Sequence, residues 1–192
     1  QKQQEHLRET QRINKQLSEL NKFLSIQKDQ YENMAKRDDL TGALNRAGAR
    51  ESLETLLRQH RPGTPQNASL ISIDIDHFKQ INDTHGHNVG DEVLKQLTAL
   101  IDTHTRTKDR FVRWGGEEFI LVCPDTTIEQ AMQLAETLRS TIEKHNFIDN
   151  YPVTCSFGVA QLDSHNFEES FKCADKALYA AKKAGRNRVA RK

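Results

Sequence analysis

The sequence predicts an α+β domain with a mostly antiparallel sheet and flanking helices, preceded by a long N-terminal helix. The first observation is the order of apolar patterns after residue 37, which runs helix, strand, helices, hairpin, helix, strand, helix. The second is Gly115-Gly116 between two short apolar runs, which predicts a β-hairpin. A parallel sheet does not easily accommodate a central hairpin, so we expect antiparallel pairing.

Residues 1–36 contain no Gly or Pro and place apolar residues at seven-residue intervals, which is typical of a coiled-coil helix. The repeat has Thr10, Leu17, Leu24 and Tyr31 at one position and Ile13, Leu20, Gln27 and Met34 at the other. A helix this polar has little to bury except a partner helix. We therefore predict a homodimerising stalk that carries a signal from an upstream sensor, with a solvated linker helix as the alternative. Residues 37–192 form the second predicted unit.

Length and charge narrow the class of protein. The 192 residues suffice for one domain plus an appendage, and the net charge of +1 gives no sign of a nucleic-acid-binding surface. The longest apolar run, residues 119–123, is far shorter than the ~20 residues that span a membrane, and no signal peptide is present. Because the first residue is Gln1 and not Met, we expect a piece of a longer protein. We expect this piece to lie in the cytoplasm. Its upstream sensor domain, itself a candidate for membrane anchoring, would be missing.

Amphipathic segments and turn residues define the elements of the second unit. Helices are expected at residues 46–60, 77–82, 91–103 and 167–184, with a further helix capped at Thr126 or Thr127. Strands are expected at residues 71–76, 111–122 (the hairpin) and 153–159, and a loop at residues 61–67. The scattered cysteines are interpreted as small core residues in a reducing compartment; they are Cys123, Cys155 and Cys173.

Two acidic clusters are candidates for a metal site. Asp74 and Asp76 alternate with apolar residues and so share one face of a strand, and Glu117 and Glu118 follow the glycine pair of the hairpin. Carboxylates from two strands form an oxygen-rich site suited to Mg²⁺, which is usually held by one or two carboxylates plus substrate phosphates. Taken singly, each cluster is also explained as a solvated strand end or hairpin tip.

Residues 114–119, with the motif Trp-Gly-Gly-Glu-Glu-Phe, and residues 74–91 together resemble the GGDEF-type diguanylate cyclases in their GGEEF variant. The family's opening motif is matched over residues 38–46, except that Ala43 stands where the family has Leu. The resemblance covers about residues 37–190 and implies a palm-like sheet related to ferredoxin-like folds. It also implies that a homodimer condenses two GTP into cyclic di-GMP with release of pyrophosphate, each 3′-hydroxyl attacking the α-phosphate of the other nucleotide.

The resemblance further implies roles for single residues at the reacting phosphates. The metal, Mg²⁺ or alternatively Mn²⁺, would be held by Asp74, the backbone carbonyl of Ile75 and Glu117. Glu117 would also accept the hydroxyl proton, and Glu118 would act by its charge or as a second metal contact. Lys79 would face the phosphate, although a lone lysine is more commonly a surface residue. Lys182 and Arg186, a helical turn apart, would bind the triphosphate, or they simply reflect the preference for cations at a helix C-terminus.

Base recognition is assigned by the same resemblance. Asn82 and Asp91 match the positions that bind guanine, and His87 and Phe78 are further substrate-pocket residues. A carboxylate suits guanine, which presents N1–H and N2–H donors together. Zinc binding by His85 and His87 is disfavoured because no Cys or third His stands at ligand spacing.

Arg106 and Asp109 match the family's inhibitory RxxD motif, at its usual spacing before Gly115. We interpret them as a site where product binds and inhibits, with a plain surface ion pair as the alternative. Two rival functions stay open at this point. One is a catalytically silent module that binds cyclic di-GMP; the other is a coiled-coil scaffold with a purely structural globular part.

Overall fold

The computed structural model describes residues 2–59, 67–149, 151–163 and 166–192. The side chains of residues 2–8, 10 and 54–59 are outside this description, as is the predicted loop at residues 61–67 except for Asn67. The chain divides into two compact units, Gln1–Lys36 and Arg37–Lys192. No helix among the described residues has both the length and the apolar character needed to cross a membrane.

The first unit is one continuous helix, α1 (Lys2–Ala35), as the absence of Gly and Pro predicts. Its large apolar side chains from Ile13 onward are more than half exposed, including six of the eight predicted seam positions. These six are Ile13, Leu17, Leu20, Leu24, Tyr31 and Met34. Phe23 and Ile26 add exposed apolar area outside the repeat. Such a helix presents a stripe that only another molecule or another part of the protein can cover, and dimerisation through it stays a prediction.

The second unit contains five further helices and five strands in its described part. The helices are α2 (Arg46–Gln59), α3 (Phe78–His85), α4 (His87–Asp102), α5 (Ile128–Lys144) and α6 (Phe167–Lys183). The strands are β1 (Ala68–Ile75), β2 (Arg110–Gly115), β3 (Glu118–Pro124), β4 (Cys155–Gln161) and β5 (Val189–Arg191). The predicted elements are all present with ends shifted by a few residues, and β5 is an addition.

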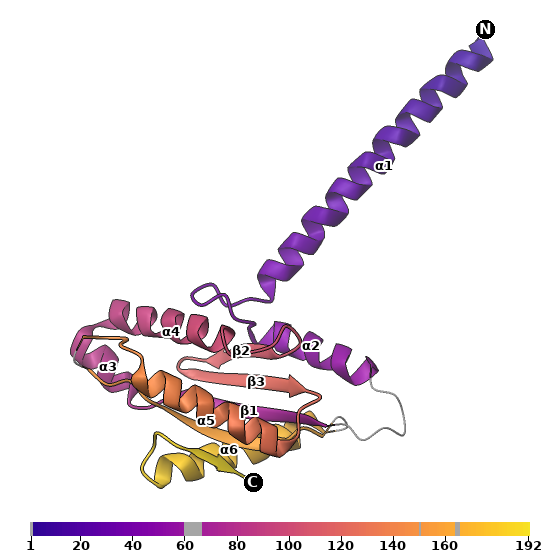
Figure 1. The fold of residues 1–192 in the computed structure, drawn as a ribbon. Helices are drawn as coiled ribbons and strands as arrows, with labels where there is room; N and C mark the ends of the chain where they lie inside the picture. The colour runs from indigo at the N-terminus through magenta and orange to yellow at the C-terminus, as the bar shows by residue number, and fades with distance from the viewer. Residues whose placement is uncertain (1, 60–66, 150, 164–165) are drawn as a thin grey trace. The chain divides into compact units, whose positions relative to one another are not determined.

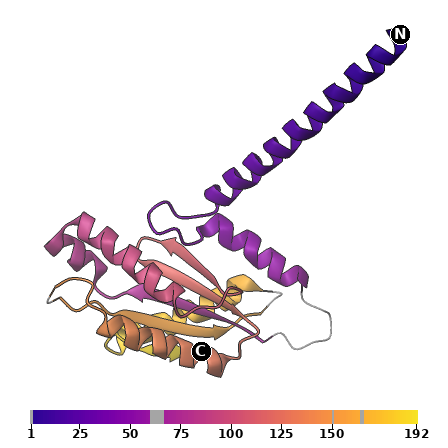
Figure 2. The same cartoon turned by 45° about the horizontal axis from the view of Figure 1, so that its top comes forward.

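The strands form one sheet in the order β2-β3-β1-β4-β5 (Figure 1). All neighbouring pairs are antiparallel except β4 and β5, which pair in parallel. The predicted α+β class with a mostly antiparallel sheet is therefore confirmed. β1 lies in the centre, so that both the hairpin β2-β3 and the strand β4 flank the strand that carries Asp74 (Figure 2).

Helices cover both faces of the sheet, and each face has its own apolar core. Side chains of α3, α4 and α5 pack on one face with Ile71, Ile73 and Ile75, while side chains of α2 and α6 pack on the other with Leu70. Ser72 and Asp74, on this second face, are buried. The polar side of β1 therefore lies beneath a helix, whereas strict alternation of polar and apolar residues more often marks a solvated face.

Local signals in the sequence account for several element ends. Thr127 and Gln130 form the capping box of α5, and Thr126, the other predicted cap, is buried beside Arg106 instead.

Two of the three cysteines, Cys123 and Cys155, are buried, Cys173 is half-buried, and all three are free thiols. Phe171 is half-buried on α6, and Leu56 and Leu57 of the predicted helix at residues 46–60 lie outside the described side chains.

Candidate active site

The centre of the candidate site is a cross-strand pair. Asp74 on β1 lies directly opposite Glu118 on β3, and on its other side it pairs with Ser156 of β4. Directly opposed residues of an antiparallel pair project from the same face of the sheet. The register of β1 against β3 thus brings Asp74 of one predicted acidic cluster to Glu118 of the other.

Glu117 lies in the turn of the hairpin and not in a strand. β2 ends at Gly115 and β3 begins at Glu118, so Glu117 stands in the turn itself, after Gly116 with its φ of 45°. The strand rule that adjacent side chains face opposite ways does not apply to a turn residue. Glu117 and Glu118 consequently both act electrostatically on Asp74.

The hairpin tip is held by an arginine network that sequence reasoning did not identify. Arg113 donates through Nε and Nη2 to the carbonyl of Gly116, at 3.0 and 2.9 Å, and through Nη1 to Asp38 at 2.9 Å. Asp38 in turn accepts from the amide and hydroxyl of Thr41, at 2.9 and 2.7 Å. Arg46 donates to the carbonyl of Trp114 and lies over its ring. Asp38, Thr41 and Arg46 belong to the opening motif, which was the available signal.

Asp74 is a buried carboxylate in an acidic environment. Burial raises its pKa to about 6, the ion pair with Lys182 opposes this rise, and the charges of Glu117 and Glu118 add to it. Lys182 comes from the last turn of α6, and its Nζ lies 2.9 Å from Asp74 Oδ2. The structure therefore places a predicted triphosphate ligand against a predicted metal ligand.

These residues fit a hard divalent cation by the chemistry of their donors. The charges of Glu117 and Glu118 both act on Asp74, which is paired with Lys182, so additional positive charge beside Asp74 would be favourable. Within the described part of the chain, no group of three or more His, Cys, Asp or Glu side chains is close enough to hold a metal. Mg²⁺ takes few protein ligands and usually completes its shell with phosphates and water.

The second Asp of the strand is not available to the site. The carboxylate of Asp76 accepts from Thr154, Ser156 and the backbone N–H of Asn187 at 2.7–3.0 Å, and the residue is 4% exposed. The expectation that Asp74 and Asp76 form one oxygen-rich site is therefore wrong for Asp76. Its hydrogen-bonding capacity is used in holding β4 and the segment after α6.

The predicted base-binding residues lie where α3 meets α4. Asn82 Oδ1 is buried and has no hydrogen-bond partner, and it lies so close to Gly90 that a Cβ there would be 1.9 Å away. Asp91 is the next residue on α4, half-buried, and His87 is exposed at the start of that helix. An orphan acceptor next to a carboxylate suits a ligand edge that presents several N–H donors. Phe78 is buried, and its Cζ would lie 3.3 Å from the same Cβ on Gly90.

The predicted phosphate-binding residues lie at the ends of α3 and α6. Lys79 is exposed in the first turn of α3, whose start is not capped by a side chain, so that its first backbone N–H groups remain available. Arg186 is exposed just after α6, with a left-handed backbone φ of 62°. Neither side chain has an ion-pair or hydrogen-bond partner among the described residues.

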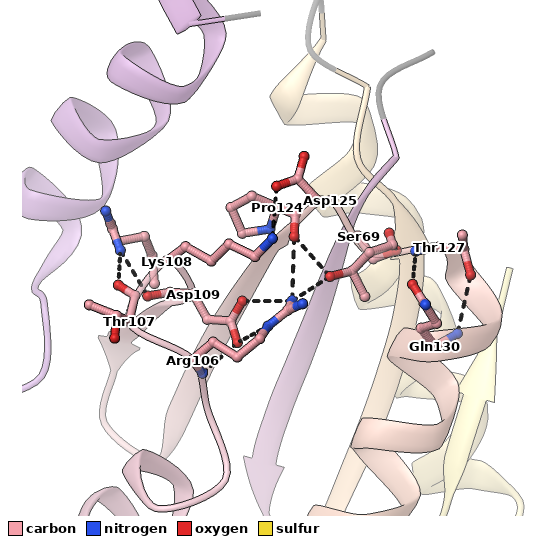
Figure 3. A network of polar contacts seen from close by, with 11 residues as sticks. Ser69, Arg106, Thr107, Lys108, Asp109, Pro124, Asp125, Thr127 and Gln130 are labelled. Atoms are coloured by element: carbon pink, nitrogen blue, oxygen red, sulfur yellow. Dashed lines mark hydrogen bonds and ion pairs between the residues drawn. The ribbon is translucent and has the colours of Figure 1, made fainter. Parts of the chain in front are cut away.

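Arg106 and Asp109 form an ion pair, the contact foreseen in the alternative interpretation. The guanidinium of Arg106 lies 3.0 Å from Asp109 and also donates to Thr126 and to the carbonyl of Pro124 (Figure 3). In the same view Lys108 reaches Asp125. A cavity of about 470 Å³ opens beside the pair, and its lining includes two further arginines, Arg37 and Arg110. The lining also includes Asp102, so three arginines face two carboxylates around a concave surface, and a phosphate-bearing ligand could bind the arginines.

The fold and the site define an α+β domain whose acidic hairpin lies beside the central strand. Residues 35–188 match the family described as "Diguanylate cyclase, GGDEF domain". The chain belongs to this GGDEF family. The assignment rests on most of the second unit and not on the hairpin motif alone.

Individual relatives agree with the family. The diguanylate cyclase DgcM of Escherichia coli K12 is 43% identical over 162 residues, which are 84% of this chain and 39% of DgcM. DgcP of Pseudomonas aeruginosa is 40% identical over 183 residues, 93% of this chain and 27% of DgcP. The chain therefore spans less than half the length of these curated relatives.

Two solved structures are similar in fold. The coiled coil and GGDEF domain of DgcB from Caulobacter crescentus, in complex with c-di-GMP, has a TM-score of 0.82 at 28% identity, covering 94% of this chain and 97% of that one. The active GGEEF domain of a diguanylate cyclase from Vibrio cholerae has a TM-score of 0.65 at 38% identity, covering 76% of this chain and 92% of that one. The GGEEF variant thus occurs in a relative described as active.

Proposed function

We propose that residues 37–192 form a GTP-specific diguanylate cyclase domain that condenses two GTP into cyclic di-GMP and two pyrophosphates. The observation that carries the proposal is the pair of Asp74 and Glu118 on adjacent strands, with Glu117 in the turn beside them. Family membership and the active GGEEF relative support it. We place the domain in the cytoplasm, where GTP and divalent metal are at hand.

In this proposal the acidic cluster prepares the attack of the 3′-hydroxyl. Asp74, the carbonyl of Ile75 and Glu117 would hold Mg²⁺, or alternatively Mn²⁺. The metal supplies charge neutralisation at the α-phosphate and favours the alkoxide form of the hydroxyl. Glu117 accepts the hydroxyl proton, and Glu118 raises the negative potential that retains the cation.

The cationic residues bind the triphosphate. Lys182, which pairs with Asp74 in this structure, would bind a phosphate of the nucleotide instead, and a bound metal would supply the positive charge beside the carboxylate. Lys79 and Arg186, both exposed, reach the phosphates from α3 and from the segment after α6. Such preorganised charge is suited to phosphoryl transfer, in which positioning and electrostatic stabilisation account for most of the catalysis.

Base selection in the proposal rests on Asn82 and Asp91. Asn82 Oδ1 is buried without a partner, so an N–H donor of guanine would satisfy it, whereas adenine offers no N1–H. Asp91 accepts from the remaining donors, and Phe78 and His87 complete the pocket. A nucleotide lacking the donors leaves these groups unpaired, which discriminates strongly against it.

A single domain holds one GTP in this scheme, so ring closure requires two domains. The exposed apolar stripe of α1 supports a homodimer through a coiled coil, with an upstream sensor setting how the two sites face each other. We test this by comparing the full chain with residues 37–192 in sedimentation and activity measurements. Dimerisation and activity should both fall on truncation; an equally dimeric and active fragment would contradict a role for α1.

Product control completes the proposal. Cyclic di-GMP would bind beside Arg106 and Asp109, where Arg37 and Arg110 add positive charge to the cavity. The guanidinium of Arg106 would then exchange its bond to Asp109 or Thr126 for a phosphate or guanine of the product.

The reaction is tested by incubating the chain with GTP and Mg²⁺ and separating the nucleotides by chromatography. Glu117→Gln should abolish cyclic di-GMP formation, whereas Glu168→Gln, an exposed glutamate on α6, should leave it intact. Absence of product from a folded, dimeric parent, together with tight binding of added cyclic di-GMP, would instead favour the catalytically silent binding module. If the chain showed neither cyclase activity nor binding of cyclic di-GMP, the structural scaffold would be the remaining interpretation.

A further inference from the structure

A buried hydrogen-bond network joins the centre of the sheet to the segment after α6. Asp76 accepts from Thr154 Oγ1 at 2.8 Å, from Ser156 Oγ at 2.7 Å and from the backbone N–H of Asn187 at 3.0 Å. The carboxylate thus reaches a residue 111 positions later in the chain. Both hydroxyl donors come from the β4 side of the sheet, so Asp76 ties Asn187 to the strand neighbouring Asp74.

The side chain of Asn187 is held from the other direction by α5. Its Oδ1 accepts from Arg139 Nη1 at 2.9 Å, and its Nδ2 donates to Glu143 Oε1 at 2.7 Å. Arg139 is itself fixed by Glu143 and Glu136, at 2.9 and 2.8 Å. Backbone and side chain of Asn187 are therefore both anchored, by elements that are distant in sequence.

This anchoring falls beside a strained backbone. Arg186 and Asn187 have φ values of 62° and 43°, a left-handed conformation that non-glycine residues adopt at an energetic cost. The N–H of Arg186 donates to the carbonyl of Ala181 at 3.1 Å, and its carbonyl accepts from Arg188 Nε at 2.9 Å. The main chain around Arg186 is thus fixed on both sides, while its exposed guanidinium has no partner among the described residues.

We propose that Asp76 and Asn187 are positioning residues, which hold Arg186 in its left-handed conformation so that its guanidinium binds the terminal phosphates of the nucleoside triphosphate beside Lys182. The inference rests on the proposed function, in which Arg186 is a triphosphate ligand. Neither Asp76 nor Asn187 touches the nucleotide. Their effect is to fix the backbone from which the guanidinium extends, and a preorganised side chain loses less entropy on binding.

The competing explanation is that the network only stabilises the fold. A double-mutant cycle separates the two, because a positioning role requires Arg186 whereas a structural role does not. The probes are an unreactive GTP analogue and GMP, titrated by calorimetry into the full chain with Mg²⁺. The variants are Asn187→Ala, Arg186→Ala and the pair, with Asp76→Asn as a second perturbation should Asn187→Ala fail to fold.

The positioning role predicts that Asn187→Ala weakens binding of the triphosphate by about tenfold, the equivalent of about 1.4 kcal/mol, without changing the affinity for GMP. In the Arg186→Ala background the same substitution should have no further effect. Asn187→Gly, which tolerates the left-handed backbone, should lose less affinity than Asn187→Ala.

Four results would overturn the inference. An equal loss for GMP, or an equal loss in the Arg186→Ala background, would show a structural role alone. If Arg186→Ala lost triphosphate affinity and Asn187→Ala did not, Arg186 would still be a triphosphate ligand, but Asn187 would have no positioning role. Full triphosphate affinity in Arg186→Ala would instead contradict the role of Arg186 in the proposed function, and the positioning role with it.

Discussion

Lys182 Nζ lies 2.9 Å from Asp74 Oδ2, so that the last turn of α6 neutralises a carboxylate on the central strand. This contact links two residues that the family resemblance assigns to different ligands, the triphosphate and the metal. It also explains how an aspartate with 6% exposure remains compatible with the fold, since a buried charge needs a partner.

The first prediction concerns the pH dependence of stability without metal. Burial raises the pKa of Asp74 from 3.8 to about 6, so the folded chain binds this proton more tightly than the unfolded chain. Its ionisation therefore removes stability as the pH rises from about 4 to about 6. Asp74→Asn should raise the free energy of unfolding by about 1–3 kcal/mol at pH 7 and have little effect at pH 4.

Denaturant unfolding of the metal-free chain from pH 4 to pH 8 checks this. Asp175→Asn, at an exposed position on α6, is the matched control and should change little at any pH. If Asp74→Asn made the chain less stable than the parent at pH 7, the ion pair would outweigh the burial of the charge. The same substitution should abolish cyclase activity, because a neutral amide cannot replace the carboxylate at the cation.

The second prediction concerns Gly90, where α4 passes against Asn82. A Cβ at this position would lie 1.9 Å from Asn82 Oδ1, so Gly90→Ala must displace the Asn82 side chain. We expect about tenfold weaker binding of GTP, the cost of one misplaced polar contact, in an otherwise folded chain. Calorimetric titration with an unreactive GTP analogue measures the loss.

The double variant with Asn82→Ala is the control for this mechanism. Because the clash involves Asn82, adding Gly90→Ala to Asn82→Ala should cost no further affinity. Additive losses would show that Gly90→Ala acts through another part of the pocket, such as Phe78.

The third prediction concerns the arginine that holds the hairpin tip. Arg113→Lys cannot bind Asp38 and the Gly116 carbonyl together, because lysine lacks the guanidinium fork. Glu117, the next residue after Gly116, should then lose its fixed position. We expect kcat to fall by about tenfold with a change of less than about twofold in KM.

Steady-state kinetics with GTP and Mg²⁺ provide the measurement. Asp38→Asn should show a weaker effect of the same kind, and Asp39→Asn, its exposed neighbour, should show none. A rise in KM with unchanged kcat would place Arg113 in substrate binding and not in positioning of the tip.

The fourth prediction concerns product control at the RxxD pair. Arg106→Ala should relieve inhibition by added cyclic di-GMP without lowering the initial rate, because the pair lies outside the acidic cluster. Lys108→Ala removes a cation from the same loop and should leave inhibition unchanged, since Lys108 is paired with exposed Asp125. Initial rates at increasing product concentrations distinguish the variants. Unchanged inhibition in Arg106→Ala would show that Arg106 and Asp109 form only a surface ion pair.

The sequence was sufficient for the elements whose signals are local. Gly115-Gly116 between apolar runs predicted the hairpin, and the alternation through Asp74 predicted a strand with its carboxylate on one face. The heptad repeat predicted the unbroken α1, and the capping signal at Thr126 or Thr127 predicted the start of α5 to within one residue. The meeting of Asp74 with Glu118 followed only with the help of the family resemblance, because register between distant strands has no local signal.

Features that depend on distant contacts were not predicted. The three residues of β5, Val189–Arg191, are too few to give a strand pattern, and their partner β4 lies some thirty residues earlier. Asp76 has the same local setting as Asp74, yet it is bound to Asn187 across 111 residues. Which of two similar aspartates stays available to a ligand is decided by tertiary contacts alone.

The contact between α6 and β4 has a consequence for the reach of Lys182. A Cβ on Gly158 would lie 2.1 Å from the carbonyl oxygen of Ala174 and 2.2 Å from the amide of Leu178, so the helix rests on bare backbone there. Lys182 extends from the same helix one turn after Leu178, a rise of about 6 Å. The absence of a side chain on Gly158 therefore sets the distance between α6 and the sheet. This distance in turn determines whether the ammonium group of Lys182 can reach Asp74.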